Sequence, residues 1–262
     1  MNMKISMSVI AAAFLLMTVS ASGAESDNGN AGSTVIAKYT SESVKLDGKL
    51  DEGAWAKASA YSLMLPLKSY SNMPESMQKN IGENLREKSA VKLLWDDNYL
   101  YVGAEFDDSD TMNEGKEDQG FLFSTGDLLE VFLKPAKENY YWEIYGTPNN
   151  KKSWIFFPSR GRTVFPGCLS YLPENLKVAT IVDGTLNNWK DKDKGCTLEI
   201  AIPIKELTAY GAKFDNSASW TILLARYNYS AYLPQPELSA YPQLSNANWH
   251  LHEEYAKLRL EK

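Results

Sequence analysis

The chain has 262 residues, of which 44% are hydrophobic and 23% charged, and its formal net charge is −6. This length suits one large domain or two small ones after any leader is subtracted, and the composition argues against long-range disorder and coiled coil. The acidic balance makes nucleic acid an unexpected partner, because phosphate binding needs a basic face. Two His and two Cys exclude His-rich metal sites, Cys-rich zinc modules and disulfide-dense scaffolds.

The aromatic content is the unusual feature of the composition, with 7 Trp, 15 Tyr and 9 Phe. Aromatic rings fill the cores of β-rich proteins, and they also form flat surfaces on which sugar rings stack. Composition alone leaves both uses open, so the choice between them depends on where the rings stand relative to polar side chains.

Residues 1–24 have the pattern of a secretory signal peptide. Lys4 gives a positive start, residues 7–19 form a short apolar run, and Ser22 and Ala24 fit the −3 and −1 positions of a cleavage site. We therefore expect an exported protein, in the bacterial periplasm or outside the cell, with no membrane span after cleavage; an uncleaved anchor is the alternative. Residues 25–38 are expected to form a flexible mature N-terminus, since their first part is rich in Asn, Gly and Ser.

The two cysteines, Cys168 and Cys196, would lie in a compartment where disulfides persist. A single bridge and two buried free thiols are both compatible with the sequence. Neither thiol is expected to be a catalytic nucleophile, because His250 and His252 are distant in sequence and no triad-like context surrounds them.

The remaining chain, residues 39–262, is expected to form one all-β domain. Short runs rich in Val, Ile, Tyr, Phe and Trp recur between turn signals, and no helical periodicity is sustained. The predicted strands are 90–95, 99–106, 128–134, 140–145, 153–157, 177–182, 197–202, 220–229 and 256–260. Antiparallel strands of this number predict a β-sandwich, jelly-roll-like with an immunoglobulin-like two-sheet architecture. The polar stretch 66–88 is a predicted long loop that could cover a site.

Several predicted strands carry one ionisable residue among apolar neighbours: Glu105, Glu130, Glu143, Glu199 and Arg226. Period-two alternation places Glu130 on the same face as Leu128 and Phe132, and it places Glu143 on the face of Tyr145. A charge in mid-strand is costly unless it is paired or solvated. Their recurrence favours a polar groove with an aromatic rim on one sheet, although pairing on a solvated outer face is the alternative.

The strand at 220–229 contributes two more polar candidates. Arg226 and Asn228 share a face with Ile222 and Leu224. Together with Glu and Tyr, Arg and Asn are the side chains that hydrogen-bond vicinal hydroxyls, while flat aromatic rings stack on sugar faces. The pattern therefore points to a saccharide as the ligand of the groove.

Six motifs in a fixed order resemble the carbohydrate-binding module family 9-like domains. They are LDGKLDEGAW at 46–55, VKLLWDDNYLYV at 91–102, GDLLEVF at 126–132, TLEIAIP at 197–203, NANWH at 246–250 and YAKLRL at 255–260. Each motif is weak alone, but their order over residues 39–262 makes the resemblance specific. It implies a noncatalytic β-sandwich that binds calcium structurally and holds sugars in a slot between two Trp rings.

The resemblance assigns roles at matching positions. Glu130 matches the acidic sugar ligand, Trp249 one clamp ring and Asn246 a hydrogen-bonding amide. Glu143 stands where the family has Arg, and Arg226 where it has Gln, so we expect these two side chains to form an exchanged charge pair across the groove. The second clamp Trp is missing: its position falls near Ser124, with Phe121 and Phe123 as the nearest aromatic residues.

Further residues are candidates for the rim of the groove: Phe123, Tyr145, Trp154, Arg160 and Trp189. Trp55 and Trp95 stand in the strongest motifs, yet their surroundings favour a place in the core. Asp107, Asp108 and Asp110 crowd a strand end and Asp127 opens the next strand, which suits Ca²⁺ because this ion takes six to eight oxygen ligands. Ordinary turn-forming aspartates are the alternative.

These observations predict an exported, monomeric glycan-binding protein that binds a mono- or oligosaccharide. We expect it to bind no nucleic acid and not to be an enzyme. Two alternatives stay open. A glycosidase would need two carboxylates at a defined separation, which Glu130, Glu143 and Glu199 could supply. The second alternative is a structural or partner-binding sandwich that has lost its sugar slot, because Ser124 stands near the position of the missing clamp Trp.

Overall fold

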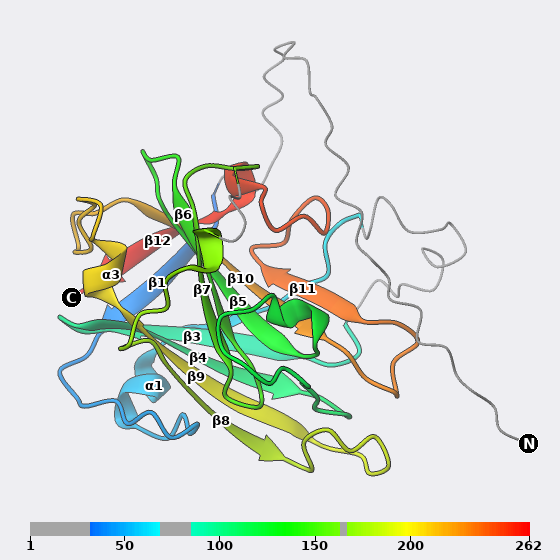
Figure 1. The fold of residues 1–262 in the computed structure, drawn as a ribbon. Helices are drawn as coiled ribbons and strands as arrows, with labels where there is room; N and C mark the ends of the chain where they lie inside the picture. Colours follow the sequence, from blue (N-terminus) through cyan, green and yellow to red (C-terminus); the bar gives the residue numbers. More distant parts are fainter. Residues whose placement is uncertain (1–31, 69–84, 163–166) are drawn as a thin grey trace, which may run out of the picture.

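The computed structural model describes residues 32–68, 85–162 and 167–262 (Figure 1). The expected signal peptide at 1–24, the first part of the expected flexible start and residues 69–84 of the predicted loop lie outside the described residues. Within the described ranges, no helix combines the length and apolar character needed to cross a membrane.

Strands are the main regular elements of the described chain. The strands are β1 (Thr34–Tyr39), β2 (Ala60–Ser62), β3 (Ser89–Trp95), β4 (Tyr99–Asp107), β5 (Leu128–Pro135), β6 (Tyr141–Gly146), β7 (Lys152–Phe157), β8 (Lys177–Asp183), β9 (Gly195–Pro203), β10 (Trp220–Asn228), β11 (Glu237–Tyr241) and β12 (Ala256–Glu261). Short helical turns join them: α1 (Gly53–Lys57), η1 (Leu122–Ser124), η2 (Gly167–Leu169), α3 (Ile204–Leu207) and η3 (His252–Glu254). Each predicted strand is confirmed, whereas β1, β2 and β11 were not predicted.

The position of β1 shows that the folded domain begins earlier in the chain than residue 39, where the sequence placed its start. Residues 34–38 were expected to be flexible, but they pair in parallel with β12 and β3 near the middle of the sheet. Val35 and Ala37 are fully buried there. The partners of β1 are distant in sequence, so its order comes from tertiary packing rather than from a local signal. These two pairings also break the expected antiparallel pattern.

The strands follow one another in a single sheet that folds over on itself. Its order is β7-β6-β5-β10-β12-β1-β3-β4-β9-β8, with β11 beside β10 and β2 beside β3. The two ends meet face to face, since the Thr180 hydroxyl of β8 donates to the Thr147 carbonyl after β6 at 3.2 Å. In Figure 1 the half containing β3, β4, β9 and β8 crosses the half containing β5, β6 and β7. The predicted β-sandwich is thereby confirmed, with its layers joined through β12 and β1.

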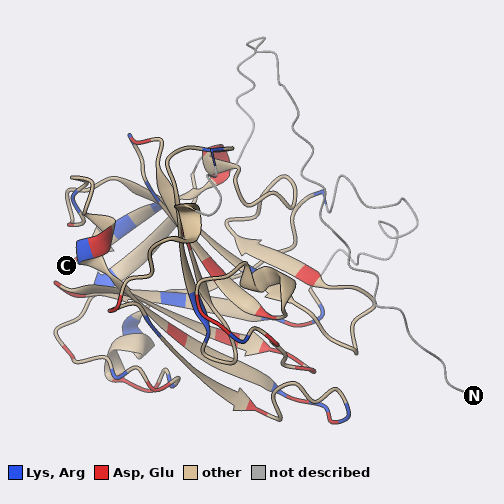
Figure 2. Ribbon diagram, viewed as in Figure 1, with Lys and Arg blue, Asp and Glu red and all other residues tan. Residues whose placement is uncertain are grey.

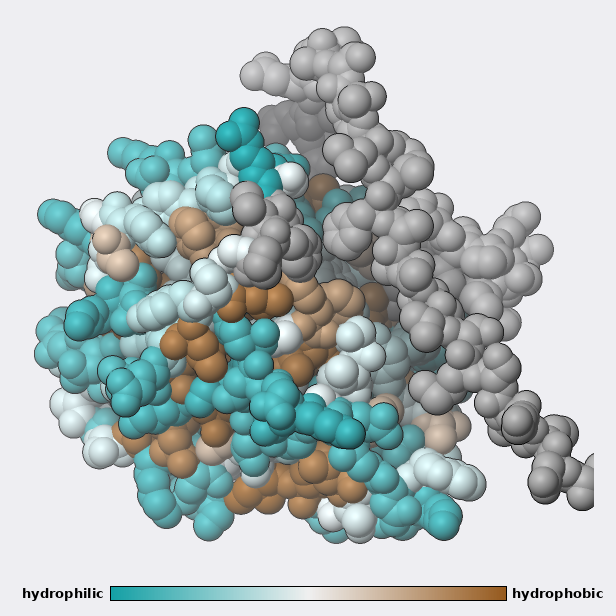
Figure 3. Space-filling model, in the orientation of Figure 1, coloured by the Kyte–Doolittle hydropathy of each residue, from teal (hydrophilic) through white to brown (hydrophobic). Residues whose placement is uncertain are grey.

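Alternation along the strands divides the hydrophobic side chains among three clusters. The inner cluster fills the space between the layers and includes Leu129, Val131, Ile144 and Ile200. A second cluster covers the outer face of β5, β6, β7, β10 and β11. A third, around Trp55, covers the outer face of β3, β4 and β9. Figure 3 shows hydrophobic residues at the centre of the face in view, bordered by hydrophilic ones.

Gly103 of β4 provides a test of the packing around Trp55. A Cβ at Gly103 would lie 2.7 Å from Leu50 Cδ2 and 3.0 Å from the Trp55 ring. We expect Gly103→Val to lower the free energy of unfolding by about 1–3 kcal/mol, because the added methyl groups overpack this contact. Urea unfolding measures the change. Gly32→Ala is the matched control, since nothing lies within 4 Å of its Cβ position; equal stability of both variants would contradict the packing.

The two cysteines lie in different clusters. Cys168 belongs to the outer cluster over β5 and β6, whereas Cys196 belongs to the inner cluster, and both are free thiols. The sequence left open a disulfide bridge or two buried free thiols, and the structure has two buried free thiols. Trp55 and Trp95 are 0% and 5% exposed, as expected for core residues.

Candidate functional site

Two carboxyl groups lie under the outer cluster, on adjacent strands. Glu130 of β5 pairs in register with Tyr145 of β6, and Phe132 pairs with Glu143, so both acids stand on one face of the sheet. Glu130 is 1% exposed and Glu143 6%. The Tyr145 hydroxyl donates to Glu143 Oε1. The predicted facing of Glu130, Glu143 and Tyr145 is therefore confirmed.

Burial changes the titration of this pair. Desolvation raises the pKa of Glu143 to about 7, although the hydrogen bond from Tyr145 acts in the opposite direction. Desolvation and the charge of Glu143 raise the pKa of Glu130 well above its ordinary value. Two adjacent buried carboxyls do not both ionise readily, so the pair favours a shared proton or an external cation.

The pH dependence of stability reports on Glu143. The folded-state pKa of Glu143 is near 7, against 4.5 for an ordinary Glu. The stability that protonated Glu143 contributes is therefore fully present below pH 4.5, and it is lost as the pH rises from 4.5 to 7. We expect Glu143→Gln to be more stable than the wild type at pH 8, by about 3 kcal/mol at most, and to lose this advantage at pH 4. Urea unfolding across this range checks it; a constant difference between the two proteins would contradict the shifted pKa.

Aromatic side chains frame the carboxyl pair. Phe123 stacks on Tyr227, with ring centroids 5.7 Å apart, and Trp249 meets the same Tyr227 ring edge-on at 6.3 Å. The Tyr229 hydroxyl fixes the Phe123 segment by donating to the Phe123 carbonyl at 2.9 Å. The structure thus places Phe123 and Trp249 against the same Tyr227 ring. Sequence reasoning missed Tyr227, although alternation along 220–229 places it on the face opposite Arg226.

Trp249 is buried rather than open in this structure. Its side chain is 5% exposed and packs in the outer cluster with Leu244 and Tyr255. Glu130 Oε2 and Trp249 Nε1 are buried atoms without a hydrogen-bond partner in the described structure. Buried polar atoms are normally paired, so these two atoms leave an acceptor and a donor unused on this side of the sheet.

Both histidines belong to the same outer face. His250 Nδ1 lies 2.9 Å from the Tyr141 hydroxyl, and the His252 ring packs on the Tyr141 ring with centroids 4.2 Å apart. Burial lowers the pKa of each histidine to about 4, so both rings are neutral at pH 7. Arg160 forms an exposed ion pair with Glu253 next to them. Their gathering was not predicted, since nothing in the sequence links 250–252 with β6.

Three predicted site residues point to the other side of the sheet. Arg226 lies inside the sandwich, where its Nη2 is 2.9 Å from Asp108 Oδ2 and its Nη1 donates to Ser89 Oγ at 2.8 Å. The expected Glu143–Arg226 pair is therefore wrong, because the two side chains leave opposite faces. Asn228 donates to Glu87 Oε2 at 2.7 Å, and Trp154 packs in the inner cluster.

The other candidates are placed as follows. Asn246 lies in the segment that leads to Trp249, and its backbone pairs with Lys68. Trp189 is 65% exposed on the β8–β9 loop, where its carbonyl accepts a hydrogen bond from Tyr232 at 3.0 Å. Trp189 is thus an exposed ring on a neighbouring loop and not part of the outer cluster.

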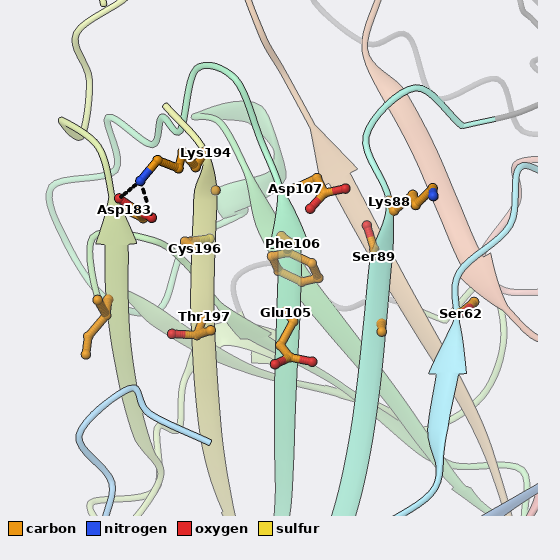
Figure 4. Close-up of a pocket in the computed structure, with 13 residues that line it drawn as sticks. Ser62, Lys88, Ser89, Glu105, Phe106, Asp107, Asp183, Lys194, Cys196 and Thr197 are labelled. Atoms are coloured by element: carbon orange, nitrogen blue, oxygen red, sulfur yellow. Dashed lines mark hydrogen bonds and ion pairs between the residues drawn. The ribbon is translucent and has the colours of Figure 1, made fainter. Parts of the chain in front are cut away.

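A separate depression lies on the outer face of the opposite layer. Its volume is about 470 Å³, and Figure 4 shows Glu105 and Thr197 on neighbouring strands with Lys194 bonded to Asp183. Phe106, the aromatic residue among its lining, is 7% exposed and lies beneath the Arg226 guanidinium. This depression therefore offers no open ring for sugar stacking, whereas Phe123 and Tyr227 at the outer face of β5 and β6 are half-buried.

Sequence comparison places the chain in a family. The model of the carbohydrate family 9 binding domain-like family matches residues 46–228. The chain belongs to this family. The match covers α1 and β2 to β10, and so it includes both carboxyls and Phe123, while Trp249 lies beyond it. Among curated proteins, none matches the chain significantly.

Solved structures of carbohydrate-binding proteins share the fold. A protein from Bacteroides uniformis ATCC 8492, provisionally designated a carbohydrate-binding protein, superposes with a TM-score of 0.63 at 10% identity, over 87% of this chain and 99% of its own. The family 9 carbohydrate-binding module of Caldicellulosiruptor kristjanssonii was solved with cellotriose and with glucose. Both structures superpose with a TM-score of 0.51 over 87% of this chain, at 15% and 14% identity, and cover 93% and 95% of the module chains.

The aspartates expected to bind calcium do not fit such an ion as a set. Asp108 accepts from Arg226, Asp110 Oδ2 accepts from the Ala231 amide at 2.8 Å, and Asp127 accepts from the amides of Met112 and Tyr229. A guanidinium already neutralises Asp108, where a calcium ion would be repelled. Among the described residues, no three His, Cys, Asp or Glu side chains are arranged to hold a metal. Structural calcium binding by this chain stays a prediction.

Proposed function

We propose that this family 9-like protein is an exported, noncatalytic carbohydrate-binding protein that acts as a monomer in polysaccharide use. A mono- or oligosaccharide would bind at the outer face of β5 and β6, between Trp249 and the wall of Phe123 and Tyr227. The signal-like leader at 1–24 supports export to the periplasm or beyond the cell.

One observation carries the proposal: Glu130 Oε2 is buried beside an aromatic wall and has no hydrogen-bond partner in the described part of the chain. An acceptor left unpaired in an apolar environment costs free energy that a ligand hydroxyl would recover. The aromatic wall supplies the stacking surface that a sugar face needs. In Figure 2 acidic and basic residues are interspersed on the face in view, which does not favour a polyanionic partner there.

A glycan array followed by isothermal titration calorimetry tests the proposal. We expect at least one saccharide to bind with modest affinity, because stacking contributes about 1 kcal/mol per ring beyond area burial. Absence of any saccharide ligand would refute carbohydrate binding and favour the structural sandwich. Hydrolysis of a bound oligosaccharide, lost in Glu130→Gln, would show instead that the carboxyl pair is catalytic.

A further inference from the structure

The carboxyl pair of the outer face faces no basic side chain that neutralises it. Among the described residues, neither Glu130 nor Glu143 forms an ion pair, and Arg226 is committed to Asp108 on the inner side. Arg160, beside the histidines of this face, pairs with Glu253, and its side chain is 45% exposed. The site therefore presents two acids without a cation of its own.

The other groups around the pair do not supply a positive charge either. Besides Arg160 and its partner Glu253, the titratable side chains of the outer cluster and its borders are Lys134, Tyr141, Tyr145, Cys168, Tyr227, Tyr229, His250, His252, Glu254 and Tyr255. Lys134 lies on the same face of β5 as Glu130, but its charge acts on Arg160, Glu253 and His252, and its ammonium donates to the Pro135 carbonyl at 3.3 Å. The phenols and the thiol are neutral at pH 7, and burial keeps both histidines neutral. Tyr145 donates one hydrogen bond to Glu143, which leaves Glu130 Oε2 without a donor.

A buried carboxylate needs a proton, a hydrogen-bond donor or a cation. A neutral sugar brings hydroxyl donors but no charge, whereas a protonated amine brings three donors and the missing charge at one atom. Hydrogen bonds to charged groups are stronger than those between neutral groups. A carboxylate on the ligand, as in a uronic acid, would instead be repelled by the pair.

On this basis, and resting on the proposed function, we propose that the site selects a sugar that carries a protonated amine. The ammonium group lies against Glu130 and Glu143, and the sugar ring lies toward Trp249. Trp249 Nε1, the unpaired donor of the same cluster, is available to a ring or glycosidic oxygen. The ligand class is therefore a hexosamine with a free amino group, alone or at the end of a chain.

Three matched trisaccharides test this inference by titration calorimetry at pH 7, where Glu143, with its pKa of about 7, is partly ionised. The β-1,4-linked trimers of glucose, glucosamine and N-acetylglucosamine differ only at C2, which bears a hydroxyl, an ammonium or an acetamide. We expect the glucosamine trimer to bind at least about tenfold more tightly than the other two, as a charged hydrogen bond implies. Monomeric glucosamine, measured in parallel, distinguishes a free hexosamine from a chain end as the source.

Variants locate the effect. Glu130→Gln and Glu143→Gln should each reduce the preference for the glucosamine trimer to about threefold or less, since each removes one acid from the pair. Glu105→Gln is the control, because this mid-strand glutamate is exposed on the opposite layer. Equal or tighter binding of the glucose trimer, or an unchanged preference in both site variants, would overturn the inference while leaving carbohydrate binding intact. Binding of no saccharide would overturn both.

Discussion

Replacing Arg226 by Met is expected to lower the melting temperature by about 10 °C. Arg226 and Asp108 are 1% and 0% exposed, and their contact joins β10 to the loop that follows β4 across the interior of the sandwich. Removing one partner of a buried ion pair costs about 3–5 kcal/mol because the other charge is left uncompensated. For a domain of this size that corresponds to roughly 10 °C. Thermal unfolding followed by circular dichroism measures the shift.

A double-mutant cycle separates charge from packing in this prediction. Met retains part of the contact with the Phe106 ring, over which the guanidinium lies at 4.5 Å. We expect Asp108→Asn to recover a large part of the stability lost in Arg226→Met, because the double variant buries no unpaired charge. Additive losses in the double variant would contradict charge compensation. The calcium prediction has a separate test on the wild type: chelation of divalent ions by EDTA should lower the melting temperature, and an unchanged temperature would count against a structural ion.

Replacing Trp249 by Ala is expected to weaken saccharide binding by at least about tenfold. The substitution removes the ring that forms one wall of the proposed site and contacts Tyr227, with a loss of about 1.4 kcal/mol or more from stacking and burial. Calorimetric titration with the tightest ligand of the glycan array gives the dissociation constant. Because Trp249 is buried, near-ultraviolet circular dichroism must first show that the variant is folded.

Trp189→Ala is the matched control for this experiment. Trp189 is 65% exposed on the β8–β9 loop and lies outside the outer cluster, so its removal should leave both affinity and stability nearly unchanged. A large loss of affinity in Trp189→Ala, with none in Trp249→Ala, would place the sugar on the loop. That result would contradict the proposed site.

Most of the fold could be predicted because its strands carry local signals. Runs such as 91–95 and 128–134 combine β-branched or aromatic residues with alternation, and the turn at 96–98 is fixed by Asp96, whose Oδ1 accepts from the Asn98 and Tyr99 amides at 2.7 Å. β11 has the sequence ELSAY, with weak strand propensity, and is held by its pairing with β10. Such strands depend on distant partners, which a single sequence does not specify.

The candidate site shows the same division. Within single strands, alternation correctly placed Glu130 with Phe132, Glu143 with Tyr145, and Arg226 with Ile222 and Leu224, because side-chain facing is a local property. The resemblance then suggested a pair between Glu143 and Arg226, which alternation could not test, since it does not relate the faces of different strands. Register resolves the question: Arg226 pairs with Leu129, an inner residue, and Ala225 pairs with Glu130.

The central claim, that a saccharide binds beside Trp249 at the outer face of β5 and β6, is tested most directly by nuclear magnetic resonance. The chain has 7 Trp, and each gives one indole N–H signal in the ¹⁵N-labelled protein. Titration with a saccharide found on the array should shift the Trp249 signal, assigned by its loss in Trp249→Ala, while the Trp55 signal from the opposite face stays in place. A Trp249 signal that does not move at saturating ligand would contradict the proposed site.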